Sequence, residues 1–555
     1  MKNYLTNSIF LSWFWKRLFL LPICFLVINF STPISFALNT TNVKARLVYS
    51  SRWKEPFTEK QKGQRSGGKF DVLVNSAVYD SLENHLLQYS NDLENENEPY
   101  DVSIYDCDIN SPDSLRNFLR QEYEQDNIAG AIFVGQFPHV MYQGMASMGT
   151  IYQEFPTETF FRDVDGSWLD TLMYDPDTNT LIPGSDGIYD THIDGNGDRE
   201  TEIYLGRIDA SNLTYGNNIF GGEIQRLTNY FEKNHSYRIE ELTSSDSALI
   251  YFDDWAYHQA PSAILQLGQV YPNIVAISDT NETTADDYNI RLQQGYQLIW
   301  LAAHSNSMSH GFQANGEWDN IFNSEIPGIN PQTLFYLING CYSGWFINPD
   351  CMLNHYVFSS DKGQISIGYS ARAPSPVGIY DMDGVGFFST LGNEGNFGES
   401  LNEIIDLDIL NQGQDPWKPN GYAMVLLGDP TLKPRYGNVG VDDWHHSPIA
   451  NVLYQNYPNP FNPDKIGTTT ISFHLATDLH PSSAVAMLRR VDRLTQIKIY
   501  NLKGQLVRNF SIVNHQSSII WDGRDENGNQ LSNGIYFYQL KTENYSEVKK
   551  MILIR

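Results

Sequence analysis

The sequence has only four cysteines in 555 residues, and this scarcity narrows the chemistry available to it. No two of them form a Cys-x-x-Cys pair, which argues against a structural zinc site. Cys24 lies in an N-terminal segment that we expect to be removed, which leaves Cys107, Cys341 and Cys351. Three cysteines cannot all pair within one chain, so at least one thiol is free and is a candidate reactive group. A disulfide between Cys107 and Cys351 stays an open alternative.

Positive charge is also scarce. The sequence contains 37 Lys and Arg residues and 65 Asp and Glu residues, and the net charge is −28. Nucleic acid and anionic membrane surfaces are excluded as expected partners, because both are bound through basic surfaces. We attribute most of the acidity to solubility outside the cell and part of it to calcium binding.

Long apolar runs are missing beyond the N-terminus. Residues 18–30 are almost wholly apolar, Lys16 and Arg17 precede them, and Ser35-Phe36-Ala37 is a small-x-small cleavage pattern. This pattern predicts a secretory signal peptide over residues 1–37. Its apolar core is short for a spanning helix. We therefore expect an exported protein with no integral membrane span after cleavage.

Beyond residue 68 the pattern alternates between strands and helices. Apolar runs at Phe70–Val74, Ile128–Val134 and Ala248–Phe252 predict strands, and Ile365–Gly368 predicts another. Helical spacing of apolar residues occurs between them, for example after the start signal Asn110–Asp113. This alternation predicts a doubly wound α/β sheet with parallel strands.

A polar stretch without periodicity at 437–449 predicts a linker, and the pattern of predicted secondary structure changes after it. Short β runs with turns at 501–504 and 525–528 then predict a small β-sandwich, which Pro481–Thr495 interrupts as a long loop. The expected parts are a signal peptide (1–37), a linker or short pro-segment (38–67), an N-terminal α/β subdomain (68–230), a catalytic subdomain (231–436), a linker (437–452) and the β-sandwich (453–555).

Two apolar runs end on reactive side chains. Residues 298–303 are followed at once by His304, and residues 334–338 are followed by Asn339-Gly340-Cys341. Each run is typical of a strand buried on both faces. The carboxyl ends of parallel strands meet at one edge of a sheet, and a thiol near an imidazole can become a thiolate nucleophile. The pattern predicts a cysteine hydrolase, with a buried packing role as the alternative for either residue alone.

This pair of strands resembles the caspase-like cysteine peptidases, and most of all the gingipain-type family. Tyr422–Leu432, which contains Leu-Gly-Asp-Pro, is similar to the segment that closes that family's catalytic domain. Gly187–Asp190 and Ile203–Ile208 resemble its earlier Asp-rich and Gly-Arg stretch. The resemblance covers about residues 68–436. It implies a caspase-like doubly wound sheet with flanking helices, and an endopeptidase that acts on protein or peptide substrates.

The resemblance also implies roles for individual residues. Cys341 would attack the scissile carbonyl, and His304 would orient the reacting groups and protonate the leaving amine. Asp253 or Asp254, at the end of the preceding predicted strand, would fix the tautomer of the imidazole. The alternative for these two acids is a solvated strand end. No cofactor is required for this chemistry.

The sequence departs from the family after the histidine, where Ser305 replaces the usual glycine. Gly340 fits the small residue that the family has before the cysteine. His310, followed by Gly311, is a rival for the catalytic histidine. We prefer His304 because it directly ends a predicted strand, and we assign His310 to the lining of the cleft.

The loop at 370–376 corresponds to the loop that helps form the family's specificity pocket. Ser370 and Arg372 are therefore expected to bind substrate. Family members with trypsin-like specificity have an acid in this pocket, whereas Arg372 permits an acidic preference.

A further loop places oxygen ligands at alternate positions: Asp194, Asn196, Asp198 and Glu200. Hard cations such as Ca²⁺ favour such ligand sets. The loop is not an EF-hand, because the glycine at loop position six and the distal glutamate are missing. We predict a stabilising calcium site, with an acidic surface loop as the alternative.

The C-terminal β region carries an ordered set of motifs that resembles the sorting domain of the type IX secretion system. The motifs are Tyr457–Pro463, Lys498–Asn501, Trp521–Gly523, Asn533–Tyr536 and Lys549–Met551. The resemblance implies the secretion machinery as a partner. It also implies export through the periplasm of a Gram-negative bacterium, then release or surface attachment. A generic β-sandwich binding module is the alternative.

Three functions are therefore weighed. The first is an exported cysteine endopeptidase, which the presence of both His304 and Cys341 favours. The second is an inactive relative that keeps the fold and binds protein or peptide, which Ser305 favours mildly. The third is a non-catalytic surface component of the secretion machinery, a role that some gingipain-like folds serve.

Overall fold

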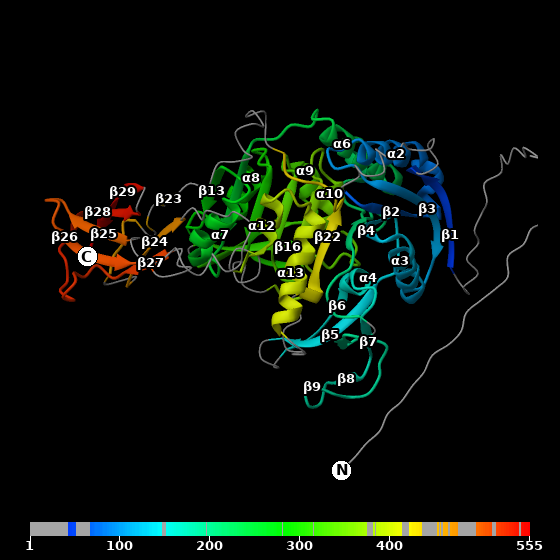
Figure 1. Ribbon diagram of the computed structural model, residues 1–555, viewed down its shortest axis with the longest axis horizontal. Coiled ribbons are helices and arrows are strands. Elements are labelled where there is room, and N and C mark those ends of the chain that lie inside the picture. Colours follow the sequence, from blue (N-terminus) through cyan, green and yellow to red (C-terminus); the bar gives the residue numbers. More distant parts are fainter. Residues whose placement is uncertain are drawn as a thin grey trace, which may run out of the picture. The chain divides into compact units, whose positions relative to one another are not determined.

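The computed structural model of the chain (Figure 1) describes residues 43–51, 67–146, 151–195, 197–279, 281–314, 316–373, 381–382, 385–412, 421–435, 452–453, 456, 459–463, 467–474, 496–512, 518–542 and 545–555. The predicted signal peptide, the predicted loop at 481–495, Asn196 and most of the 437–452 linker lie outside these residues.

An 11-stranded sheet organises the α/β part of the chain. Its order is β1 (Val43–Ser50), β3 (Asp101–Ile109), β2 (Lys69–Asn75), β4 (Ile128–Val134), β11 (Tyr204–Ile208), β22 (Met424–Gly428), β19 (Ile365–Tyr369), β18 (Phe335–Asn339), β14 (Leu298–Ala302), β12 (Ser247–Phe252) and β13 (Asn273–Ile277). The strands predicted near residues 70, 128, 248 and 365 are all present, and the predicted α/β class is confirmed.

The sheet consists of two parallel halves that run in opposite directions. β22 pairs in parallel with β11 but antiparallel with β19, and edge strand β1 is antiparallel to β3. The prediction of parallel strands therefore holds within each half and fails at the junction and at this edge. As a result, the amino ends of β11 and β22 share an edge of the sheet with the carboxyl ends of β19, β18, β14 and β12.

Helices cover both faces of the sheet because its strands are apolar on both sides. Along β14, Ile299 and Leu301 join the core on one face, while Leu298 and Trp300 join the core on the other. The first face is covered by α2 (Ser76–Glu94), α6 (Glu223–Arg238), α8 (Ala285–Leu292) and α10 (Met352–Phe358), and the second by α3 (Pro112–Asp126), α7 (Ala260–Leu267), α12 (Phe387–Gly392) and α13 (Phe397–Gln412).

Short elements connect these layers and extend past the sheet. They are β5 (Val140–Ala146), β6 (Ile151–Thr157), α4 (Thr159–Arg162), β7 (Ser167–Leu169), β8 (Leu172–Asp175), β9 (Thr180–Pro183), β10 (Thr191–Ile193), α5 (Asn217–Phe220), β15 (His304–Asn306), β16 (Ser309–Ala314), β17 (Glu317–Phe322), α9 (Ile326–Ile329), β20 (Asp381–Met382) and β21 (Val385–Gly386). β15, β16 and β17 form a small antiparallel sheet of their own, which begins at His304.

The C-terminal part is a small antiparallel β domain, as predicted. One sheet contains β23 (Val452–Leu453), β24 (Thr469–His474) and β27 (Ser518–Trp521), and the other contains β26 (Leu506–Ser511), β25 (Gln496–Asn501), β28 (Gly534–Lys541) and β29 (Ser546–Leu553). Trp521 and Phe461 are buried in its core, with their ring centroids 5.4 Å apart. Gly504 and Gly528 have positive φ angles at the two predicted turns, a conformation that glycine adopts without steric cost.

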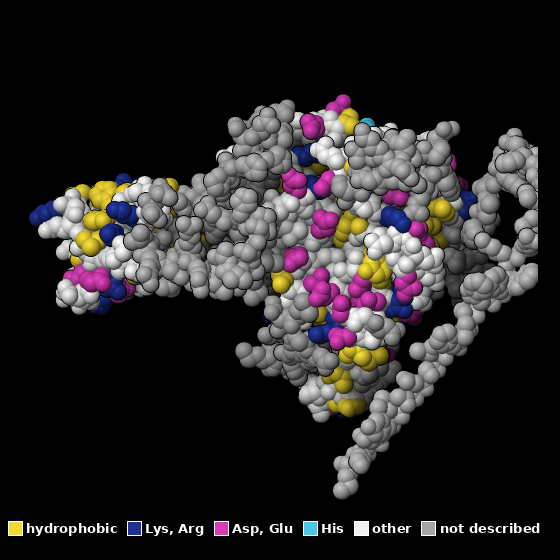
Figure 2. Space-filling view, viewed as in Figure 1, with side chains coloured by type: hydrophobic (Ala, Val, Ile, Leu, Met, Phe, Trp, Pro, Cys, Tyr) yellow, Lys and Arg dark blue, Asp and Glu magenta, His cyan; other side chains and the backbone are white. Residues whose placement is uncertain are grey.

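The surface reflects the excess of acidic residues. Figure 2 shows acidic side chains spread over the visible face of the α/β part, with fewer basic ones among them. Within the described residues, no helix combines the length and the apolar character needed to cross a membrane.

Candidate active site

Three neighbouring strands end in register at one edge of the sheet. The last residues of β12, β14 and β18 lie abreast of one another as paired positions in the parallel ladder. Two residues further along, the chain reaches Asp254, His304 and Cys341, respectively. Because all three segments leave the sheet from adjacent positions, a carboxylate, an imidazole and a thiol start from the same edge.

The His304 imidazole is oriented by Asp254. His304 Nε2 lies 3.3 Å from Asp254 Oδ1, and the imidazole is 47% exposed. Asp254 Oδ1 also accepts the backbone N–H of Trp255 at 2.7 Å, which holds the carboxylate in place. The rings of Trp318 and Trp255 flank the imidazole, with centroids at 5.0 and 6.4 Å. With Nε2 engaged by the carboxylate, Nδ1 is the imidazole nitrogen that remains for chemistry.

Asp253 has different partners from those of its neighbour. Its buried carboxylate accepts hydrogen bonds from Thr283 Oγ1 at 2.7 Å and from the Gln313 N–H at 2.9 Å. Burial raises the pKa of Asp253, and those two hydrogen bonds oppose the rise. Of the two acids predicted to orient the imidazole, the structure brings Asp254 to it and uses Asp253 to fasten β16.

Cys341 lies in a tight turn directly after β18. Its thiol is free and partly exposed. The next residue, Tyr342, has a φ of 56°, a left-handed conformation that is costly for a residue with a side chain. The Tyr342 N–H donates to the Ala371 carbonyl at 2.7 Å, and Ser343 Oγ donates to the Gly340 carbonyl at 2.8 Å. Among the described residues the Cys341 N–H has no hydrogen-bond acceptor, so it is available to a bound oxyanion.

The other two described cysteines are unsuited to nucleophilic chemistry. Cys107 and Cys351 are both buried and free, so the disulfide left open by the sequence is absent. Burial raises the pKa of both thiols, that of Cys351 to about 12. A buried thiol with a raised pKa forms little thiolate and is inert.

His310 is buried beneath the site. Its Nδ1 lies 2.7 Å from Ser305 Oγ, and its ring lies parallel to that of Tyr356 at 5.9 Å between centroids. Burial lowers the pKa of His310 to about 3, so the ring is neutral. The structure therefore places this rival histidine behind Ser305, whereas His304 faces solvent.

The two predicted substrate-binding residues differ in accessibility. Ser370 is buried, and its Oγ lies within hydrogen-bond distance of two carbonyl oxygens, that of Pro156 at 2.6 Å and that of Ala423 at 3.0 Å. Arg372 is exposed, and its backbone N–H donates to Gln153 Oε1 at 3.2 Å. Burial and the neighbouring Cys341 raise the pKa of Tyr342, and the charge of Arg372 opposes them, so all three side chains share one electrostatic environment.

The loop predicted to bind calcium does not gather its carboxylates. Asp194, Asp198 and Glu200 are exposed, and Asp194 pairs instead with Arg199 at 3.0 Å. The loop nevertheless closes over another acid, because the Asp198 N–H donates to Asp165 Oδ1 at 3.3 Å. Asn196 lies outside the described residues.

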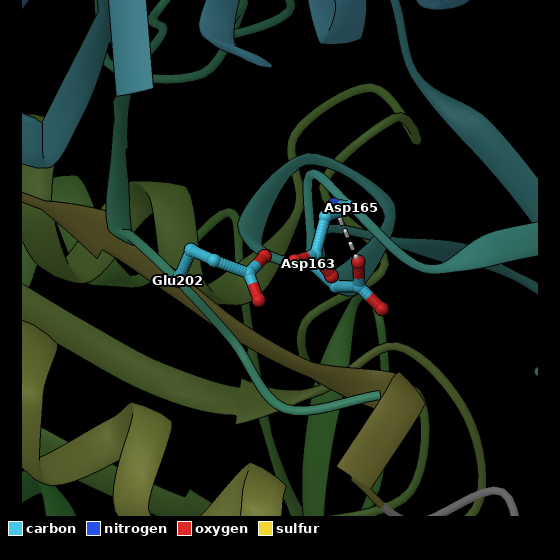
Figure 3. A group of neighbouring side chains, drawn as sticks. All are labelled: Asp163, Asp165 and Glu202. Atoms are coloured by element: carbon cyan, nitrogen blue, oxygen red, sulfur yellow. Dashed lines mark hydrogen bonds between the residues drawn. The ribbon is translucent and has the colours of Figure 1, made fainter. Parts of the chain in front are cut away.

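A different acidic group comes together beside this loop. One carboxylate oxygen from each of Asp163, Asp165 and Glu202 lies within 4.8 Å of the others, and Figure 3 draws the three side chains. Burial raises the pKa of Glu202 to about 8, although the Val164 N–H opposes this, and both aspartates add to the rise. The like-charge repulsion, which Arg116 offsets only in part, and the all-oxygen donor set fit a hard cation. The triad could therefore hold a metal ion.

Asp163 is held rigidly for such a role. Its carboxylate accepts the backbone N–H groups of Asp165 at 3.1 Å and Gly166 at 2.7 Å, lies 3.4 Å from Arg116, and bonds His192 Nε2. Sequence reasoning missed Asp163 and Asp165. Their Asp-x-Asp spacing was the available signal, but Glu202 completes the group from a distant part of the chain.

A thiol, an imidazole and a carboxylate that leave adjacent strands at one edge of an α/β sheet are the functional groups that cysteine hydrolases use. The model of peptidase family C25 matches residues 97–435, more than half of the chain. The chain therefore belongs to peptidase family C25, the gingipain family of cysteine peptidases, and the resemblance seen in its motifs is confirmed. A second model, that of the FlgD Ig-like domain, matches residues 475–546.

The solved structures compared with this chain match it with low TM-scores. PorZ, described as an essential bacterial surface component of the type IX secretion system of Porphyromonas gingivalis, and dimeric latent PorU from the same organism each share 18% identity over 24% of this chain, with TM-scores of 0.14. This chain covers only 14% and 11% of their lengths. An engineered protein shares 10% identity over 89% of this chain and 95% of its own, with a TM-score of 0.18. No curated protein matches the chain.

Proposed function

We propose that the protein is an exported cysteine endopeptidase with Cys341 as its nucleophile. The observation that carries this proposal is the register of β12, β14 and β18, whose ends lead to Asp254, His304 and Cys341. Membership of a cysteine peptidase family supports it independently. The experiment that tests it is the removal of the Cys341 thiol in Cys341→Ala, which should abolish peptide hydrolysis.

The proposed reaction is acyl transfer in two steps. The Cys341 thiolate attacks the scissile carbonyl carbon, and the Cys341 N–H stabilises the oxyanion. Collapse of this intermediate breaks the C–N bond, and the imidazolium of His304 donates its Nδ1 proton to the leaving amine. Neutral His304 then takes a proton from water as the water oxygen attacks the thioester carbon; the C–S bond breaks, and the acid product and the Cys341 thiolate are released beside the imidazolium. Asp254 keeps the proton on Nε2 in the neutral form, so that Nδ1 faces the substrate.

Arg372 is proposed to select acidic side chains in the substrate. It is exposed, and it follows Ala371, whose carbonyl fastens the turn after Cys341. A peptide library should therefore show at least about tenfold higher kcat/KM for substrates with Asp or Glu near the scissile bond, the worth of about one charged hydrogen bond. Arg372→Ala should lose this preference, and Arg372→Glu should reverse it toward Lys and Arg.

The matched control is Lys44→Ala on β1, which removes another exposed positive charge, far from Cys341 in the sheet order. It should leave the cleavage profile unchanged. An Arg372→Ala protein with the wild-type profile would remove Arg372 from substrate selection.

Export through a type IX secretion system is proposed from the C-terminal motifs. The small antiparallel β domain and the Ig-like family match support a separate folded module there. Deletion of residues 453–555 should therefore trap the protein in the periplasm of a host that has this system. Fractionation and immunoblotting would measure this, and unchanged appearance outside the cell would refute the sorting role.

A structural divalent cation, Ca²⁺ by donor type, is proposed for the Asp163–Asp165–Glu202 triad. Three carboxylates within 4.8 Å of one another repel unless a cation or proton lies among them. The ion takes no part in the proposed acyl transfer. It would offset this repulsion and fasten the segment after α4 to the segment that enters β11.

A further inference from the structure

Ser305 and Gly340 are packed more closely than two residues with side chains could be. A Cβ atom at Gly340 would lie 2.1 Å from Ser305 Oγ and 2.5 Å from Ser305 Cβ, far inside the 3.5–4.0 Å of favourable contact. Gly340 directly precedes Cys341, and Ser305 directly follows His304. The segment that carries the thiol and the segment that carries the imidazole therefore touch at this point.

Space, and not backbone conformation, requires glycine at position 340. Gly340 is not among the residues with a positive φ, so alanine could adopt the same backbone without strain. The atoms nearest to an added Cβ all belong to Ser305 and Ala303. The requirement for glycine is thus created by the serine side chain that faces it.

Ser305 cannot readily turn away from this contact, because its hydroxyl is held from behind. Ser305 Oγ lies 2.7 Å from His310 Nδ1 and donates to the Ala303 carbonyl at 3.2 Å. A hydroxyl has one proton, so donation to Ala303 leaves Oγ to accept a proton from Nδ1 of His310. This arrangement assigns the imidazole proton to Nδ1.

The His310 ring is itself fixed by aromatic packing. It lies parallel to the Tyr356 ring, at 8° between planes, and edge-on to Tyr288 at 6.3 Å between centroids. Its Nε2 is buried with no hydrogen-bond partner among the described residues, which suits an unprotonated nitrogen better than an N–H. His310 is therefore a rigid, neutral donor to Ser305.

We propose that Ser305 and His310 are positioning residues which, with Gly340 as their counterpart, set the distance between Cys341 and His304. This inference rests on the proposed peptidase function. His310 holds the Ser305 hydroxyl, and this hydroxyl fixes the β15 backbone next to His304. Because Gly340 has no side chain, the turn that carries Cys341 can approach Ser305 closely. None of the three residues touches the substrate or takes part in proton transfer.

A double-mutant cycle at the contact tests the proposal. Gly340→Ala should push the two segments apart and lower kcat/KM by about 100-fold, a loss typical of a small misplacement of reacting groups. Ser305→Gly should lower kcat by about tenfold with KM unchanged. The double variant, with room for the new methyl group, should recover to within about threefold of Ser305→Gly. A double variant no more active than Gly340→Ala, or a wild-type-like Gly340→Ala, would overturn the proposal.

His310→Phe provides a variant that keeps the ring packing and loses only the donated hydrogen bond. It should lower kcat with KM unchanged and should not be rescued by Ser305→Gly, because the hydroxyl is the group that His310 acts upon. A variant that loses thermal stability but keeps the wild-type kcat would assign His310 a purely structural role.

The rate of Cys341 alkylation by iodoacetamide, followed against pH, separates this inference from the proposed function. It needs no substrate, and the buried Cys107 and Cys351 contribute little to it in the native protein. If the wild-type protein cleaves no peptide, the proposed function fails. A double-mutant cycle in the alkylation rates then still reports whether Ser305 and Gly340 are coupled. If the effects of the two substitutions on the logarithm of the rate simply add, the two residues are not coupled.

Discussion

Replacing Cys341 with alanine is expected to lower kcat/KM for peptide hydrolysis by about 10⁴-fold or more. Nucleophile removal in hydrolases that act through a covalent intermediate has effects of this size, because no other group can form the acyl intermediate. The variant should keep its fold, since the thiol is only partly buried and makes no hydrogen bond among the described residues. Initial rates with a peptide library, together with a thermal unfolding scan, would measure both effects.

The neighbouring residues should give graded losses. His304→Ala removes the proton donor to the leaving amine and should cost about 10²- to 10⁴-fold in kcat. Asp254→Asn keeps the shape of the side chain but loses its charge and allows the other imidazole tautomer, and it should lower kcat by up to about 10⁴-fold, as loss of the acid that orients a catalytic imidazole does. Asp253→Asn is the matched control, because the same chemical change on the adjacent residue affects Thr283 and Gln313 and not the imidazole.

The cysteine variants also distinguish the peptidase from its two alternatives. An inactive relative, or a structural component of the secretion machinery, would show no hydrolysis above that of Cys341→Ala with any substrate in the library. A thiol-directed peptide probe that labels the wild-type protein and Cys341→Ala equally would exclude Cys341 as the nucleophile. Cleavage lost in Cys107→Ala but kept in Cys341→Ala would move the nucleophile to another cysteine.

Removing Asp163 is expected to have the largest effect on stability. Its carboxylate is buried and is shared by Arg116, His192 and two backbone N–H groups. Asp163→Ala would remove the ion-pair partner of the buried Arg116, and loss of one partner of a buried pair costs about 3–5 kcal/mol. The midpoint of thermal unfolding of the α/β part should fall accordingly, and added Ca²⁺ should no longer raise it.

Glu202→Gln separates cation binding from structural damage. Like-charge repulsion contributes to the raised pKa of Glu202, so the neutral side chain should leave the calcium-free protein as stable as the wild type or more stable. It should nevertheless lose the increase in unfolding midpoint that Ca²⁺ gives the wild type, because a ligand stabilises only the state that binds it. An equal Ca²⁺ effect in wild type and Glu202→Gln would refute the proposed cation site.

The central strands of the catalytic half could be predicted from sequence because they are continuous apolar runs. Residues 298–302 and 335–339 are buried on both faces, and this burial leaves a clear pattern. The direction of β22 could not be predicted, because parallel and antiparallel central strands have the same apolar pattern. The predicted sheet was therefore right in class and in the six strands that were named, incomplete because it lacked β1, β3, β11, β13 and β22, and wrong at the junction with β19.

Side-chain environments were harder to predict than strands. The sequence distinguished His304 from His310 only by its place at the end of a predicted strand, and it did not predict that His304 is 47% exposed while His310 is buried against Tyr356. The difference arises because β15 turns back into β16, which carries His310 under the site. The acidic triad was missed for a similar reason, since it depends on contacts between segments distant in sequence.

The reversal of direction between β19 and β22 also determines which loops can place inserted residues near Cys341. Loops that follow the strands of the first half emerge on the side of the sheet away from Cys341, whereas loops that precede those strands emerge on the same side as the thiol. Extra residues in the loops that follow the strands of the first half would enlarge the molecule without approaching Cys341. Extra residues in the loops that precede those strands would surround the thiol, so the segments that enter β11 and β22 could shape the substrate site together with the loop after β19 that carries Arg372.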